Sequence, residues 1–143
     1  MIKRYKESEI HELAEILKND GVISVPTDTV FGVCARMNSQ IAYDKLIRVK
    51  NRPENKAFPV MCANEAQIKS IARVDKKAEK LIRKFMPGPI TLVLKKNENL
   101  PSYITNGKDT IAVRMATSKA LEELIIETHH FNHTNTLYGC FNP

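Results

Sequence analysis

Apolar residues recur along this chain at the spacing of amphipathic helices. In residues 8–19, the positions of Ile10, Ala14 and Leu17 predict one helix with Ser8 as its N-cap. The same periodicity predicts further helices over residues 39–49, 65–72, 75–85 and 118–127. A side chain that can accept a hydrogen bond from the first turn precedes each of them, at Ser39, Asn64, Asp75 and Ser118.

Two of these helices have apolar stripes that predict which side faces the core. In residues 39–49 the inward positions are expected to be Ile41, Ala42, Leu46 and Val49. In residues 75–85 they are expected to be Ala78, Leu81, Ile82 and Phe85. The outward face of the second helix is cationic, with Lys76, Lys77, Lys80, Arg83 and Lys84. Such a face is either solvated or contacts the phosphates of RNA.

Short apolar runs rich in β-branched residues lie between the helices and predict strands. They cover residues 22–26, 57–63, 90–94 and 110–114. Strands that alternate with helices indicate an α/β fold. Neither an internal repeat nor an interdomain linker is evident, so one domain is expected from 143 residues.

The composition and the N-terminal sequence indicate in which compartment the protein is expected and which class of molecule it is expected to bind. The net charge of +6 favours polyanionic partners. The chain contains neither an apolar run that could cross a membrane nor a signal-type N-terminus, so we expect a cytoplasmic protein without membrane contact. Cys34, Cys62 and Cys140 form no CxxC pair and are interpreted as structural residues.

The strongest candidate for chemistry is the cationic segment of residues 50–56, Lys-Asn-Arg-Pro-Glu-Asn-Lys. Pro53 disfavours a helical conformation at Arg52, so the segment is predicted to be a helix exit followed by an ordered loop. Arg52 offers a planar fork for phosphate oxygens, and Lys50 and Lys56 add point charges. The alternative is a solvated surface loop.

Other polar residues allow a functional or a structural interpretation. Residues 27–32, Thr-Asp-Thr-Val-Phe-Gly, follow a strand end and form either a ligand site or a turn. Arg114 ends a predicted strand and is either a surface cation or a carboxylate-binding residue. His130, His133 and Cys140 are permissible zinc ligands, but their spacing matches no standard site, so no metal site is predicted.

Four segments in order resemble the YrdC-like family of threonylcarbamoyl-AMP synthases: residues 26–32, 50–56, 87–93 and 109–114. None of them is a GxGxxG, GxxxxGK[ST] or GxSxG motif. The resemblance covers about residues 8 to 126. It implies a twisted, open, mixed sheet with flanking helices around a concave basic cavity.

The resemblance also implies roles for individual residues. Lys50 and Arg52 would be catalytic. ATP would be bound by Lys50, Arg52, Lys56 and Thr110. L-threonine would be bound by Thr29, Met61 and Arg114. Met61 replaces a histidine that many bacterial members carry near the threonine, and a thioether cannot donate a hydrogen bond.

The activity implied by the resemblance is that of a nucleotidyltransferase. L-Threonine, bicarbonate or CO2, and ATP with Mg2+ would give threonylcarbamoyl-adenylate and pyrophosphate. The product would feed threonylcarbamoyladenosine modification of tRNA with the help of partner proteins, and direct binding of tRNA or double-stranded RNA is also implied.

The C-terminal part departs from the family pattern. The family continues with a strand and a Ser-Ala-Asn-x-Ser-Gly loop, whereas residues 128–143 are rich in histidine and lack strand or helix periodicity. We therefore predict an incomplete YrdC-like domain over residues 1–127, a loose tail over residues 128–143, a missing final strand with an uncovered sheet edge, and weak or absent synthase activity. The alternatives are a non-catalytic RNA-binding or regulatory module and a nucleotide-binding remnant that dimerises through the uncovered edge.

Overall fold

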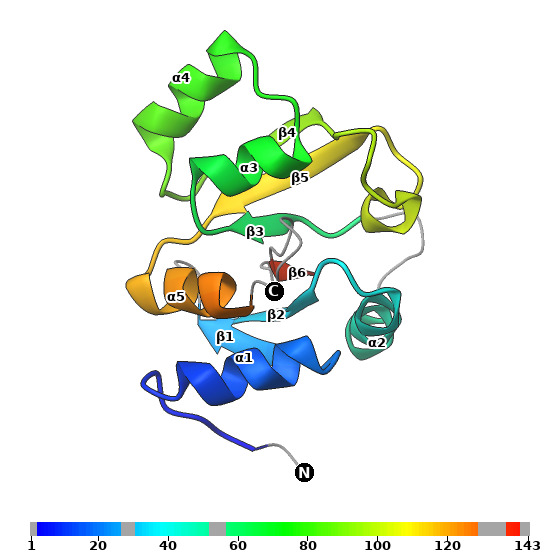
Figure 1. Ribbon diagram of the computed structural model, residues 1–143, viewed down its shortest axis with the longest axis vertical. Helices are drawn as coiled ribbons and strands as arrows, with labels where there is room; N and C mark the ends of the chain where they lie inside the picture. The colour runs from blue at the N-terminus through cyan, green and yellow to red at the C-terminus, as the bar shows by residue number, and fades with distance from the viewer. Residues whose placement is uncertain (1–2, 27–30, 52–56, 129–136, 141–143) are drawn as a thin grey trace.

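The computed structural model describes residues 3–26, 31–51, 57–128 and 137–140 (Figure 1). Helices and strands alternate along most of this length, which confirms the predicted α/β class. The helices are α1 (Ile10–Lys18), α2 (Gln40–Lys50), α3 (Glu65–Ile71), α4 (Lys76–Phe85) and α5 (Lys119–Thr128), with a 3-10 turn η1 (Ser102–Thr105). The strands are β1 (Ile23–Pro26), β2 (Phe31–Arg36), β3 (Val60–Cys62), β4 (Leu92–Lys95), β5 (Thr110–Met115) and β6 (Leu137–Cys140).

The strands form one mixed sheet in the order β1-β2-β6-β3-β5-β4. Strand β6 is antiparallel to both of its neighbours, β2 and β3, so β2 and β3 run in the same direction. Strand β5 is parallel to β3, whereas β4 is antiparallel to β5. The first residues of β2, β3 and β5 therefore lie along the same edge of the sheet. This edge is formed by strand ends and not by an outer strand.

Helices cover the sheet from both faces, and each face has its own core. The alternation in β3 shows the division, because Val60 and Cys62 belong to one core while Met61 belongs to the other. The first core includes side chains of α2, α3 and α4, and the second includes side chains of α1 and α5. In Figure 1, α1 and α5 lie beside β1 and β2.

Most of the predicted caps fix the starts of the helices. Ser39 Oγ accepts a hydrogen bond from the backbone of Ala42, and Asp75 Oδ1 accepts one from Ala78 at 2.7 Å. Equivalent bonds are made by Asn64 at α3 and by Ser118 at α5. The prediction of Ser8 as the cap of α1 is wrong, because Glu9 occupies the N-cap position and makes no side-chain cap bond.

The predicted inward faces of α2 and α4 need correction. Ile41 and Val49 are 61% and 62% exposed, and Tyr43 is buried in their place. The Tyr43 ring packs edge-on against Phe58, with the ring centroids 6.2 Å apart. Tertiary packing of the aromatic ring therefore decides the orientation of α2. In α4, Phe85 at the last turn is also exposed rather than inward.

Two strands were not predicted. Residues 31–36 form β2, although residues 27–32 were interpreted as either a ligand site or a turn. Residues 137–140 form β6, which lies between β2 and β3 rather than in a loose tail. The prediction of a loose tail is therefore wrong for residues 137–140. Neighbouring strands supply backbone hydrogen bonds on both sides of β6, so it needs little periodicity of its own.

The remaining sequence expectations concern membranes and thiols. Among the described residues, no helix has the length and apolar character needed to span a bilayer. Cys34 and Cys62 are buried free thiols, which confirms their structural interpretation. Burial raises the pKa of the Cys34 thiol to about 12 and also raises that of Cys62. Both groups are therefore neutral packing residues at ordinary pH.

Candidate functional site

The predicted site segments are attached to one edge of the sheet. The segment containing Thr29 leads into β2, and the segment containing Arg52 and Lys56 leads toward β3. Thr110 is the first residue of β5. Because β2, β3 and β5 share one direction, their entry points gather at the same edge. Thr29, Arg52 and Lys56 themselves lie outside the described residues.

Helix α2 delivers the cationic segment to this edge. Lys50 is its last residue, and Asn51 follows in a left-handed conformation with φ of 47°. Asparagine tolerates this conformation better than most residues with a side chain, and a left-handed residue commonly ends a helix. The predicted helix exit before Arg52 is therefore confirmed, because α2 ends at Lys50 and Asn51 caps it.

A polar contact anchors the other end of α2. Arg36, the last residue of β2, donates from Nη2 to Asp20 Oδ1 at 2.8 Å, and Lys45 Nζ donates to the Asp20 carbonyl at 3.0 Å. A hydrogen bond from Ser39 and the Arg36 guanidinium hold the pKa of the Asp20 carboxyl below its usual value, although partial burial opposes them. The helix that ends at Lys50 is thus tied to the sheet at its start.

Met61 and Arg114 are direct neighbours on β3 and β5. Both side chains are buried, Met61 at 1% and Arg114 at 8% exposure. Residues directly opposite one another project from the same face of a sheet, so both side chains lie on one face. The interpretation of Arg114 as a surface cation is wrong, because its side chain lies within the sheet and helix packing.

Thr110 lies on the same face of the sheet as Arg114, because the two residues are four positions apart in one strand. On this face, side chains of β4 and of the start of β5 are exposed to solvent. Thr110 and Lys95 are exposed and Val93 is 66% exposed, whereas Ile111 and Val113 on the opposite face are buried. Of the described helices on this side, α1 and α5 pack over β1, β2 and β3. The structure therefore brings Met61, Arg114 and Thr110 together on one partly open sheet face.

No resident metal centre is evident in the described part of the chain, where His, Cys, Asp and Glu side chains nowhere gather in threes. His130 and His133 lie outside the described residues, and the side chain of Cys140 is likewise not described.

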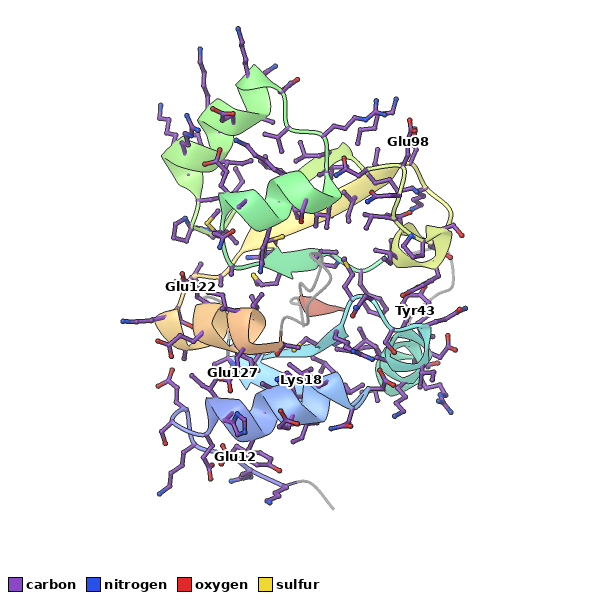
Figure 2. All side chains as sticks on the ribbon, in the orientation of Figure 1. Glu12, Lys18, Tyr43, Glu98, Glu122 and Glu127 are labelled. Atoms are coloured by element: carbon purple, nitrogen blue, oxygen red, sulfur yellow. The ribbon has the colours of Figure 1, made fainter. Side chains whose placement is uncertain are left out.

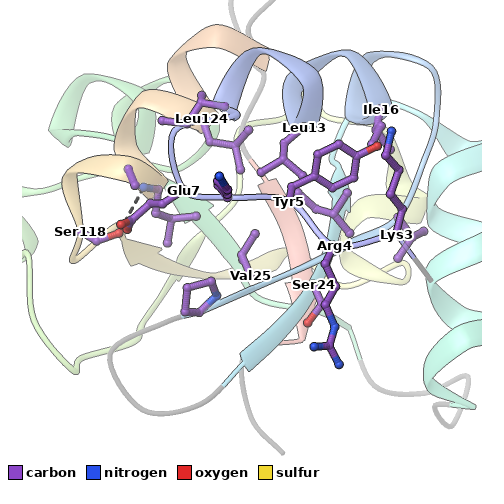
Figure 3. Close-up of a pocket in the computed structure, with 17 residues that line it drawn as sticks. Lys3, Arg4, Tyr5, Glu7, Leu13, Ile16, Ser24, Val25, Ser118 and Leu124 are labelled. Atoms are coloured by element: carbon purple, nitrogen blue, oxygen red, sulfur yellow. Dashed lines mark hydrogen bonds between the residues drawn. The ribbon is translucent and has the colours of Figure 1, made fainter.

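A cavity of about 980 Å3 lies elsewhere, between the N-terminal segment, α1, β1 and α5 (Figure 3). Its walls are largely apolar, with Leu13, Val25 and Leu124 among them, and Tyr5 of the N-terminal segment also lines it. Of the predicted site residues that the structure describes, Lys50, Met61, Thr110 and Arg114 do not line this cavity. Pro26, the first residue of the motif at residues 26–32, is the described motif residue in its wall.

Comparison with protein-family models identifies residues 15–135 as a match to Sua5_yciO_yrdC, described as telomere recombination. A threonylcarbamoyl-AMP synthase of Pyrococcus abyssi is 34% identical over 124 residues, which are 86% of this chain and 36% of that protein. One from Enterobacter sp. is 32% identical over 127 residues, 87% of this chain and 67% of the relative. The chain thus spans little more than a third of the first of these relatives.

Solved structures agree with the fold. P. abyssi Sua5 complexed with L-threonine superposes with a TM-score of 0.84 at 30% identity, covering 96% of this chain and 39% of that one. Escherichia coli YciO superposes with a TM-score of 0.80 at 23% identity, covering 95% and 65%. The expected mixed sheet with flanking helices is therefore confirmed.

Proposed function

Because the chain belongs to the Sua5/YciO/YrdC family, we propose that it forms threonylcarbamoyl-adenylate from L-threonine, bicarbonate or CO2, and ATP, with release of pyrophosphate. The relatives named threonylcarbamoyl-AMP synthase and the threonine complex of P. abyssi Sua5 support this proposal. Within this chain, it rests on the buried Arg114 on the same sheet face as Thr110.

In the proposed site, Arg114 binds the carboxylate of L-threonine. Its guanidinium can donate two parallel hydrogen bonds to the two carboxylate oxygens, and this interaction is stronger where water is scarce. Met61 is buried at its side and offers an apolar contact for the threonine methyl group. Thr29 completes the threonine contacts.

ATP is bound in this proposal by Lys50, Arg52, Lys56 and Thr110. The cations neutralise the triphosphate, and Mg2+ enters with the phosphate oxygens. Lys50 and Arg52 serve as catalytic residues because they stabilise the charge that builds up on pyrophosphate as it leaves. The Lys50–Asn51 turn supports this arrangement, because it directs the chain out of α2 at the start of the cationic segment.

The chemistry requires no protein nucleophile. The threonine amine attacks the carbon of CO2, and loss of a proton from nitrogen gives a carbamate. A carbamate oxygen then attacks the α-phosphorus of ATP, and the bond from that phosphorus to the β-bridging oxygen breaks, so pyrophosphate leaves. The protein contributes the orientation of the two substrates and fixed positive charge.

Pyrophosphate release tests the proposal. Release should depend on ATP, threonine and bicarbonate together, and Arg114→Lys should raise the KM for threonine because a lysine cannot form the bidentate contact. Lys77→Ala, which removes an exposed cation of α4, serves as the control. The proposal fails if release is independent of threonine, and rapid turnover would contradict the predicted weak activity.

The second candidate is a non-catalytic module that binds tRNA or double-stranded RNA. It is favoured by the outer face of α4, where Lys76, Lys77, Lys80 and Lys84 are all exposed. This candidate predicts RNA binding that weakens steeply with salt, without turnover of ATP. Replacement of these lysines by alanine should then reduce both the RNA affinity and its dependence on salt. Binding to tRNA-modification proteins would be a further property of either function.

A further inference from the structure

Lys95 is the last residue of β4 and lies directly opposite Thr110 of β5. Side chains of such a pair leave the sheet on the same face, with Cβ atoms about 4.5–5.5 Å apart. Lys95 is exposed, as is Thr110. The sequence pattern ended this strand at residue 94, so Lys95 was not recognised as part of the open face.

The backbone of Lys95 is held from both sides, which fixes the direction of its side chain. Pairing with β5 holds one side. On the other side, the amide of Arg73 donates to the carbonyl oxygen of Lys95 at 2.8 Å, and an isolated bridge joins Ala72 to Lys96. Although β4 is the outermost strand of the sheet, its end is therefore not frayed.

The ammonium group of Lys95 is available to a ligand. Among the described residues, it has no hydrogen-bond, ion-pair or ring partner. The neighbouring cations differ, because Lys96 Nζ donates to the Leu100 carbonyl at 3.4 Å, and Arg73 is paired with Glu98. The exposed carboxylate of Asp109 lies next to Thr110 in the sequence and forms no ion pair with Lys95.

We propose that Lys95 is a phosphate-binding residue of the nucleotide site, reaching the triphosphate of ATP from the β4 side of Thr110. This inference rests on the proposed function, which assigns the other cations to the segment that precedes β3. A lysine suits this position because its compact charge on a flexible stem can follow the phosphates during reaction.

The test is isothermal titration calorimetry, in which ATP with Mg2+ is titrated into the full chain at fixed ionic strength. Lys95→Ala should weaken ATP binding about tenfold, the order of effect expected for loss of a charge-assisted contact. Lys95→Arg should retain most of the affinity. Lys77→Ala removes the same charge from α4 and should bind ATP as the unchanged protein does. The affinity for L-threonine and the urea unfolding midpoint should stay the same in all variants.

The outcomes separate this inference from the function on which it rests. If the unchanged protein binds ATP and Lys95→Ala binds it equally well, Lys95 is not a phosphate contact and the proposed function stands. An equal loss of affinity in Lys77→Ala would show an effect of net charge only and would overturn the inference. If the unchanged protein does not bind ATP, both proposals are wrong.

Discussion

Replacement of Leu46 by alanine tests the orientation of α2, the helix that carries Lys50 to the site. Leu46 is fully buried among side chains of the larger core. Truncation of a buried leucine costs about 2–5 kcal/mol, because the transfer free energy of the lost carbons is added to that of the cavity left behind. Since domains are stable by only about 5–15 kcal/mol, a substantial part of the stability should disappear.

Two exposed apolar residues on the same helix provide matched controls. Val49→Ala and Ile41→Ala remove side chains that are 62% and 61% exposed. Each should change the free energy of unfolding by less than about 0.5 kcal/mol, because alanine also has the higher helix propensity. The sequence pattern alone predicted that all three residues face the core, so the controls separate the two orientations of the helix.

Urea unfolding followed by circular dichroism measures the effect. The slope of the transition should be unchanged and its midpoint lowered for Leu46→Ala, while both controls unfold with the unchanged protein. The reasoning would be refuted if Val49→Ala were destabilised as much as Leu46→Ala. That result would mean that the outer face of α2 is covered in solution.

Further predictions concern a cap, an ion pair and a thiol. Asp75→Ala should cost about 1 kcal/mol in urea unfolding, because α4 loses its N-terminal acceptor. Glu127 of α5 faces α1 (Figure 2), where it contacts His11 at 2.6 Å and raises the pKa of that imidazole. The stabilisation should therefore be complete below pH 6.5 and fade as the pH rises through the higher folded-state value, so the unfolding midpoint of Glu127→Gln should converge with that of the unchanged protein at high pH. Cys34 should resist alkylation at pH 8 until urea unfolds the protein, as mass mapping of its peptide can show.

Local signals in the sequence predicted much of the fold correctly. Asn64 and Asp75 marked helix starts because an N-cap depends on residues within one turn. The strand containing Arg114 was found because its β-branched run is short and bounded. The predictions that proved wrong concern features that depend on contacts between residues far apart in the sequence. Tyr43 is inward because Phe58 packs against its ring, and nothing within α2 indicates that contact.

In the candidate site too, sequence signals indicated individual residues, whereas contacts between distant segments determine how the residues are grouped. The family resemblance indicated Met61, Thr110 and Arg114, but only the register of β3 with β5 puts Met61 directly opposite Arg114. The role of Lys95 depends on the pairing of β4 with β5, which a single strand pattern does not specify. Residues on one face of a sheet come from separate parts of the chain, so their grouping is a property of topology.

The position of β6 has a consequence for synthesis of the chain on the ribosome. Strands β1 and β2 are made early and β3, β4 and β5 later, yet in the described sheet these two groups share backbone hydrogen bonds only through β6. The early β1–β2 hairpin must therefore wait, with one edge unpaired, until residues 137–140 have left the ribosome. Closure of the sheet therefore follows the synthesis of β3, β4 and β5, and β2 keeps an unpaired edge during that interval.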